Sequence, residues 1–137
     1  MRIVCAVDGS EYAQWGVQAL QTLAGREIKQ VALVHVVDPS MLQAGAGKNS
    51  VAAQRAITAL DKAGTLLLRE AERSARVALS QAGTGPRTQF QTILAHGPFA
   101  KTIVQQAKRA KADLILMGSR GLSDIKGFLL GSTSRQV

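Results

Sequence analysis

Apolar side chains in this chain gather in four short runs, which are separated by longer segments of mixed character. The runs cover residues 2–7, 31–37, 88–95 and 112–117. The first two lack alternation of polar and apolar side chains, as expected for strands that are covered on both faces. The third alternates more, which places it nearer to an edge. The four runs predict the strands of one sheet.

The segments between these runs carry the spacing of amphipathic helices. Five positions after residue 10 fall on one helical face: Ala13, Gly16, Val17, Leu20 and Leu23. A long helix is predicted over residues 51–82, closed by a Gly-Thr-Gly-Pro stretch, and another helix follows residue 98. Residues 40–50 contain glycine and are weakly patterned, which predicts a loop.

Strand and helix therefore alternate four times along the chain. This order predicts an α/β fold in which an open parallel sheet is covered by helices on both faces, a three-layer, Rossmann-like sandwich. We expect residues 1–137 to form a single domain, which suits this length.

Small or polar residues follow each predicted strand, and these positions are the first place to look for a ligand. The four stretches are Asp8-Gly9-Ser10, Val37-Asp38, His96-Gly97 and Gly118-Ser119. In open parallel sheets, ligands bind beyond the carboxyl ends of the strands, where the strand order reverses. If the first and fourth strands are neighbours, Asp8 and Gly118 flank one crevice.

Composition places the chain among ordinary globular proteins, with 46% hydrophobic and 19% charged residues. No apolar run approaches the roughly 18 residues of a membrane span, and the first residues lack the layout of a signal peptide. The single cysteine, Cys5, cannot form an internal disulfide, which suits a reducing compartment. We therefore expect a cytoplasmic protein without a membrane partner.

The charge is unevenly spread. The formal net charge is +8, and residues 101–137 hold seven basic and two acidic side chains. Such a basic stretch attracts phosphates, on a nucleotide or on a nucleic acid, or it serves solubility alone. Aromatic residues make up only 4% of the chain, which argues against stacking platforms for single-stranded nucleic acid.

Three glycines near the end of the chain, Gly118, Gly121 and Gly131, have a spacing that suits phosphate. Glycine lets another group approach its backbone closely, and exposed N–H groups at turns and helix starts bind anions. Nearby hydroxyls and cations come from Ser132, Thr133, Arg120 and Lys126. Together these residues predict a phosphate cradle. The alternative is that the glycines only shape turns.

The pattern Gly118-x2-Gly121-x9-Gly131-Ser132-Thr133 resembles the ATP-binding signature of the universal stress protein family. Residues 3–10, 34–37, 96–98 and 113–121 resemble, in this order, the first strand and turn, the second strand, the third turn and the fourth strand of that family. The chain is identified as a member on these residues. The resemblance implies the adenine nucleotide alpha hydrolase-like form of the fold.

The resemblance also implies a nucleotide site. Asp8 would approach the ribose, or the phosphates through Mg²⁺, and Val36 or Val37 would meet the adenine with backbone groups reading its edge. The three glycines would bracket the triphosphate. The binding residues implied are Asp8, Gly9, Ser10, Val36, Val37, Met117, Gly118, Arg120, Gly121, Gly131, Ser132 and Thr133.

The function implied is that of a cytoplasmic ATP-binding module of the stress response, acting as a homodimer and regulating through its bound nucleotide. No catalytic residue is expected, because only Asp8 and Asp124 offer a carboxylate near the triphosphate, so at most slow hydrolysis follows. Three alternatives stay open. They are a slow ATPase or nucleotidyl-transfer enzyme, a basic interaction module, and a folded subunit whose nucleotide site has no ligand.

Members of the family normally finish with a fifth strand at the sheet edge, which in many of them takes part in dimerisation. Here the sequence ends at residue 137, inside the helix expected before that strand. Four strands are therefore expected and the fifth is missing. A partner at the edge of the fourth strand, further residues beyond 137, and a fragment are the three explanations.

Other candidate residues receive structural interpretations. His35 lies mid-strand between valines, which favours a hydrogen-bonded core imidazole over a base, and His96 is expected to be a turn residue. Cys5 is expected to be a small buried hydrophobe. Tyr12 and Trp15 are expected to pack rather than to stack on a ligand. No P-loop, dinucleotide fingerprint or metal-ligand spacing is present.

Overall fold

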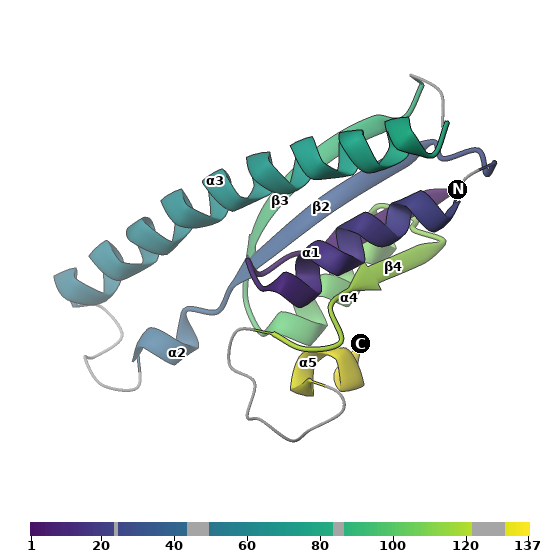
Figure 1. Cartoon of the computed structure of the whole chain (residues 1–137). Coiled ribbons are helices and arrows are strands. Elements are labelled where there is room, and N and C mark those ends of the chain that lie inside the picture. Colours follow the sequence, from purple (N-terminus) through teal and green to yellow (C-terminus); the bar gives the residue numbers. More distant parts are fainter. Residues whose placement is uncertain (24, 44–49, 84–86, 122–130) are drawn as a thin grey trace.

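A computed structural model describes residues 1–23, 25–43, 50–83, 87–121 and 131–137 (Figure 1). Four strands form one parallel sheet in the order β3-β2-β1-β4, so the predicted open α/β sheet is confirmed. The strands are β1 (Arg2–Ala6), β2 (Gln30–Val37), β3 (Gln89–His96) and β4 (Leu114–Met117). In the described part of the chain, β3 lies at one edge, as its alternating pattern predicted, and β4 lies at the other.

Helices cover both faces of this sheet, which gives three layers (Figure 1). One face packs against α1 (Glu11–Gln18), the 3-10 helix η1 (Ala19–Leu23) and α3 (Val51–Gln81), and the other face packs against α4 (Phe99–Arg109). The short helices are α2 (Ser40–Gln43) and α5 (Ser132–Gln136).

Side-chain alternation along the central strands builds a core on each face. From β1, Ile3 and Cys5 point toward α1 and α3, and Val4 points toward α4. The neighbouring β2 is buried along most of its length, with Val31, Ala32, Leu33 and Val34 at 1% exposure or less. Burial on both faces explains why these two strands read as continuous apolar runs.

Two helical segments differ from the sequence expectation. Residues 40–43 form α2 rather than a loop, because the Asp38 carboxylate accepts hydrogen bonds from the Ser40 backbone N–H at 3.0 Å and from its hydroxyl at 2.6 Å. Residues 44–49 of the predicted loop lie outside the described residues. The first predicted helix is regular only to Gln18 and continues as the 3-10 turn η1.

The long predicted helix is confirmed as α3, which begins where the Ser50 hydroxyl accepts a hydrogen bond from the Ala53 N–H at 3.1 Å. Like the other helices in the described part of the chain, it is not apolar enough over a sufficient length to cross a membrane.

Candidate functional site

The strand order reverses between β1 and β4. From β1 the chain moves through β2 to β3 on one side, and β4 then returns to the other side of β1, with Ile3 opposite Leu114 and Ala6 opposite Met117. The first and fourth strands are therefore neighbours, which the sequence alone left as a condition. Because the strands are parallel, Asp8 and Gly118 both lie at the carboxyl ends of the strands. Such sheets bind their ligands at this position.

The turn after β1 is held by the side chains of Asp8 and Ser10. The carboxylate Oδ1 of Asp8 accepts hydrogen bonds from the Ser10 N–H at 2.9 Å and from its hydroxyl at 2.6 Å. The Ser10 hydroxyl in turn accepts from the Ala13 N–H at 3.2 Å and so caps α1. Gly9 between them has a positive φ of 86°, which favours glycine. Asp8 thus fixes the residue that starts the helix.

Gly118 lets the end of β4 touch the backbone of α1. A Cβ atom there would lie 2.7 Å from the carbonyl carbon of Tyr12 and 2.8 Å from the nitrogen of Ala13. Backbone cannot move aside as a flexible side chain can, so this position excludes any side chain. The close approach of two segments, rather than a positive φ, explains this glycine.

Gly121 and Gly131 have similar surroundings. A Cβ on Gly121 would lie 2.8 Å from Oδ2 of Asp8, so the loop after β4 lies against the carboxylate that follows β1. A Cβ on Gly131 would lie 3.2 Å from Cα of Arg120 and from the carbonyl oxygen of Ser119. Neither glycine has a positive φ. All three glycines of the signature therefore have a packing role within the protein.

The start of α5 is attached to the loop after β4. The Gly131 N–H donates to the Ser119 carbonyl at 2.6 Å, and the Ser134 hydroxyl lies 3.0 Å from the same oxygen. This brings Ser132 and Thr133, the first two residues of α5, to the carboxyl end of β4. The sequence pattern did not indicate the role of Ser134. Lys126 and Asp124 lie outside the described residues.

The end of β2 distinguishes between the two candidate adenine contacts. The Val34 carbonyl accepts from the Val7 N–H of the β1 side at 2.9 Å, and the Val37 carbonyl accepts from the Gly97 N–H of the β3 side at 3.0 Å. Because peptide groups alternate in direction along a strand, those of Val36 point toward the side on which β1 has ended. Both valine side chains are buried. Only the Val36 backbone faces the crevice.

Arg120 lies beside Tyr12 of α1. Its guanidinium is 5.5 Å from the centroid of the Tyr12 ring, with Nη1 3.3 Å from the phenolic oxygen. The Tyr12 ring meets Trp15 edge-on, with the centroids 5.1 Å apart. Trp15 packs against Tyr12, as expected, but it does so at the surface, where its side chain is 57% exposed. Arg120, Tyr12 and Trp15 form a contact series from the glycine loop to the surface.

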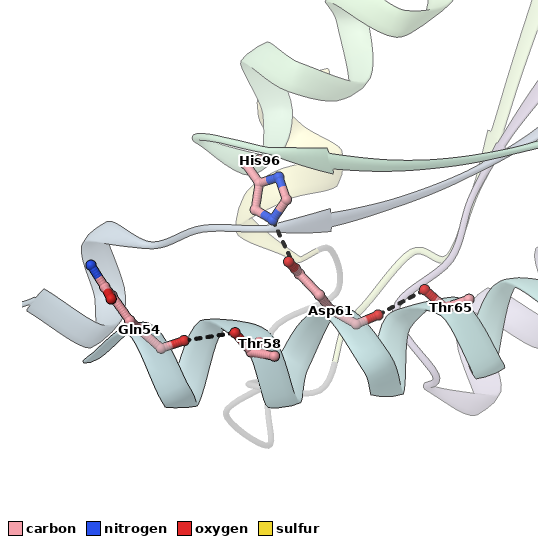
Figure 2. A network of polar contacts seen from close by, with 5 residues as sticks. All are labelled: Gln54, Thr58, Asp61, Thr65 and His96. Atoms are coloured by element: carbon pink, nitrogen blue, oxygen red, sulfur yellow. Dashed lines mark hydrogen bonds and ion pairs between the residues drawn. The ribbon is translucent and has the colours of Figure 1, made fainter. Parts of the chain in front are cut away.

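The two histidines have hydrogen-bond partners. His35 Nδ1 lies 2.8 Å from the Val7 carbonyl, which confirms a hydrogen-bonded imidazole within the fold. His96, at the end of β3, places Nε2 2.7 Å from Oδ1 of Asp61 on α3 (Figure 2). The sequence could not indicate this pair, because Asp61 is one carboxylate among several on a long helix and the contact joins residues 35 positions apart.

Cys5 is buried, and burial raises the pKa of its thiol to about 12. This confirms a small buried hydrophobe rather than a reactive thiol. Among the described residues, no three His, Cys, Asp or Glu side chains gather as metal ligands would.

Comparison with known proteins agrees with this geometry. The family model of the universal stress protein family matches residues 1–137. Universal stress protein YxiE of Bacillus subtilis is 26% identical, over 99% of this chain and 90% of the relative. The structure of universal stress protein UspA from Lactobacillus plantarum has a TM-score of 0.66 at 23% identity, over 100% of this chain and 89% of that one, and shows the fold alone.

Another solved structure, of a universal stress protein in complex with cAMP, is 26% identical with a TM-score of 0.62 and covers 100% of this chain and 86% of that one. The fold, the strand order and the family match over the whole sequence lead to one conclusion: this chain belongs to the universal stress protein family.

Proposed function

We propose that this protein is a module that binds an adenine nucleotide, in the first place ATP, in the crevice between the ends of β1 and β4. One observation carries the proposal. At the point where the strand order reverses, the Asp8 carboxylate lies against Gly121, and the Val36 peptide groups face the side on which β1 ends. At the carboxyl ends of the strands, a carboxylate thus lies together with backbone groups that have no strand partner among the described residues.

The Val36 peptide supplies the means to recognise adenine. One N–H donor and one C=O acceptor on the same residue match the donor and acceptor pattern on the edge of that base, and the buried Val36 and Val37 side chains hold the strand in place. The cAMP complex of a relative with 26% identity supports an adenine nucleotide as the ligand.

The remaining proposed contacts concern the sugar and the phosphates. Asp8, beside Gly9 and Ser10, would bind the ribose, or Mg²⁺ that also binds the phosphates, as Mg²⁺ takes one or two carboxylates together with phosphate oxygens. The loop after β4 and the start of α5 would bind the phosphates through backbone N–H groups and hydroxyls. Those residues are Met117, Gly118, Arg120, Gly121, Gly131, Ser132 and Thr133.

We propose binding rather than turnover. Hydrolysis needs a base close to the reacting phosphorus. In the described part of the crevice the carboxylate is that of Asp8, which already accepts two hydrogen bonds from Ser10. We further propose a regulatory role, in which the bound nucleotide stabilises one arrangement of residues 118–121. We place this single-domain module in the cytoplasm, in keeping with its lone buried Cys5, and we propose a homodimer through the edge of β4.

The test uses the only tryptophan of the chain. Trp15 contacts Tyr12, which contacts Arg120 of the glycine loop, so ATP binding should change Trp15 fluorescence. We expect Gly121→Val and Asp8→Asn each to weaken ATP binding about tenfold or more, which is about 1.4 kcal/mol or more. Titration calorimetry with ATP and Mg²⁺ checks both values. Native mass spectrometry of the same samples reports the bound nucleotide and the oligomeric state.

Glu70→Gln is the matched control for Asp8→Asn, because it makes the same exchange on the exposed side of α3. Asparagine keeps the oxygen that accepts from Ser10, so α1 should stay capped and the melting temperature should change little. Wild-type affinity for ATP in both crevice variants would refute the proposed site, and a monomer by mass would refute the dimer.

A further inference from the structure

A polar hollow lies at the amino ends of the strands, on the face of the sheet covered by α4. Its volume is about 450 Å³, and it is lined at the amino ends of the strands and at the end of α4. Arg2 and Asp8 are six residues apart on an extended chain, so at about 3.3 Å per residue this hollow is about 20 Å from the proposed nucleotide crevice.

Six of the eight residues that line this hollow carry side-chain hydrogen-bond donors. Three are cationic, Arg2, Arg109 and Lys111, and three are amides, Gln30, Gln91 and Gln106. The remaining two of the eight are Ile93 and Ala110, and no carboxylate lines the hollow. The carboxylate of Asp113, outside the lining, accepts a hydrogen bond from the Arg2 backbone N–H at 2.7 Å. Among the described residues, none of the three cationic side chains takes part in an ion pair.

One amide pair is held in a fixed orientation. Gln30 Nε2 donates to Gln91 Oε1 at 3.1 Å, across neighbouring strands. This bond uses the oxygen of Gln91 and leaves its NH₂ group for a ligand. A set of cations and amide donors without a carboxylate is suited to an anion with several oxygens.

The backbone of Lys111 is a second, independent observation. The helix α4 ends in a Schellman motif, in which the Ala112 N–H donates to Ala107 at 2.9 Å and the Lys111 N–H donates to Lys108 at 3.1 Å. Lys111 is the left-handed residue of that motif, with a φ of 50°, and it is the one described non-glycine residue with a positive φ. Glycine is the usual residue here because a side chain adds strain. The lysine at this strained position brings its ammonium group to the lining of the hollow.

We propose that this hollow binds a small phosphorylated anion, at a site separate from the proposed nucleotide crevice. Arg2, Arg109 and Lys111 supply the positive charge, and the glutamine amides donate to the remaining oxygens. The volume suits a molecule of the size of pyrophosphate or a sugar phosphate. No aromatic side chain lines the hollow, so bases of a nucleic acid would find nothing on which to stack.

The first experiment is titration calorimetry with inorganic pyrophosphate on the whole chain carrying Gly121→Val, in which the proposed crevice should bind phosphates weakly. We expect one site per chain. Arg109→Gln and Lys111→Gln should each weaken pyrophosphate binding about tenfold, as loss of a charge-assisted contact does. Lys62→Gln, which removes the same charge from the exposed side of α3, should leave it unchanged.

Lys111→Gly separates binding from folding. It removes the ammonium group and relieves the left-handed strain, so it should weaken pyrophosphate binding about tenfold while raising the melting temperature. A folding defect cannot produce that combination.

A ¹⁵N spectrum gives the second measurement. Pyrophosphate should shift the side-chain NH₂ signals of Gln30, Gln91 and Gln106. Three results would overturn the proposal: equal weakening by Lys62→Gln, shifts at Gly118 and Gly121 in place of the glutamines, or an oligonucleotide that binds the hollow more tightly than pyrophosphate and loses affinity in Arg109→Gln.

Discussion

At the scale of single residues, several glycines of this protein mark places where two segments touch. Gly64 shows this inside a helix, where glycine lowers stability by about 1 kcal/mol relative to alanine. A Cβ at this position of α3 would lie 2.6 Å from Cδ2 of His35 and 2.9 Å from Cδ1 of Leu94. Both side chains come from the strands beneath the helix, and His35 is also held by the Val7 carbonyl. The glycine therefore sets how closely α3 approaches the sheet.

Replacement of Gly64 by alanine should destabilise the protein despite the better helix propensity of alanine. Overpacking costs about 1–3 kcal/mol, and the gain in propensity offsets part of it, so we expect a net loss of about 1–2 kcal/mol in the free energy of unfolding. Urea denaturation measures this loss. Ser74→Ala on the exposed side of the same helix is the control and should be neutral or slightly stabilising. A more stable Gly64→Ala variant would contradict the packing described for His35.

At the scale of elements, α3 is longer than the sheet that it covers. Its 31 residues span about 46 Å, whereas the eight residues of β2 span about 26 Å, and Figure 1 shows its first turns beyond the strand ends. Only Ala53 is buried before Gly64, and five of the six buried residues lie from Gly64 onward. The first half is attached to the sheet by the Asp61–His96 contact (Figure 2).

The two halves of α3 should therefore open with different free energies. Amide hydrogen exchange should be faster over residues 54–60 than over residues 68–79, because the first half buries little apolar surface. Asp61→Asn should increase exchange in the first half alone, since it weakens the contact with His96. Uniform protection along the helix, in the wild type and in this variant, would show that α3 behaves as one unit.

At the scale of the whole molecule, β4 separates the basic residues of the last quarter of the chain. Arg109 and Lys111 precede β4 and lie at its amino end, whereas Arg120 follows it and lies at its carboxyl end. The basic residues of the last quarter, which form one stretch in the sequence, are therefore divided between the amino ends and the carboxyl ends of the strands. This division follows from β4 itself, because residues before and after a strand lie at its opposite ends.

The same reasoning separates what the sequence predicts from what it cannot. The strands, the long helix and the edge position of β3 follow from local alternation of side chains, and the structure confirms them. Contacts between distant residues do not. The fit of Gly118 against α1, the pairing of His96 with Asp61 and the exposure of Trp15 depend on the assembled layers. In the candidate site, the position of Asp8 and Gly118 at the carboxyl ends of parallel strands was predictable. That the backbone of Val36, and not that of Val37, faces the crevice was not.

The pairing of β1 with β4 has a consequence for the order of folding. Arg2 and Asp113, which are hydrogen-bonded at the start of this pair, are 111 residues apart, whereas β1 and β2 are joined by a much shorter loop. Closing the longer loop costs more chain entropy, so β4 should join last. In pulse-labelled refolding, amides of β1 and β2 should gain protection before those of β4. The crevice between β1 and β4 would then be the final part of the molecule to form, and its ligand would select chains that have finished folding.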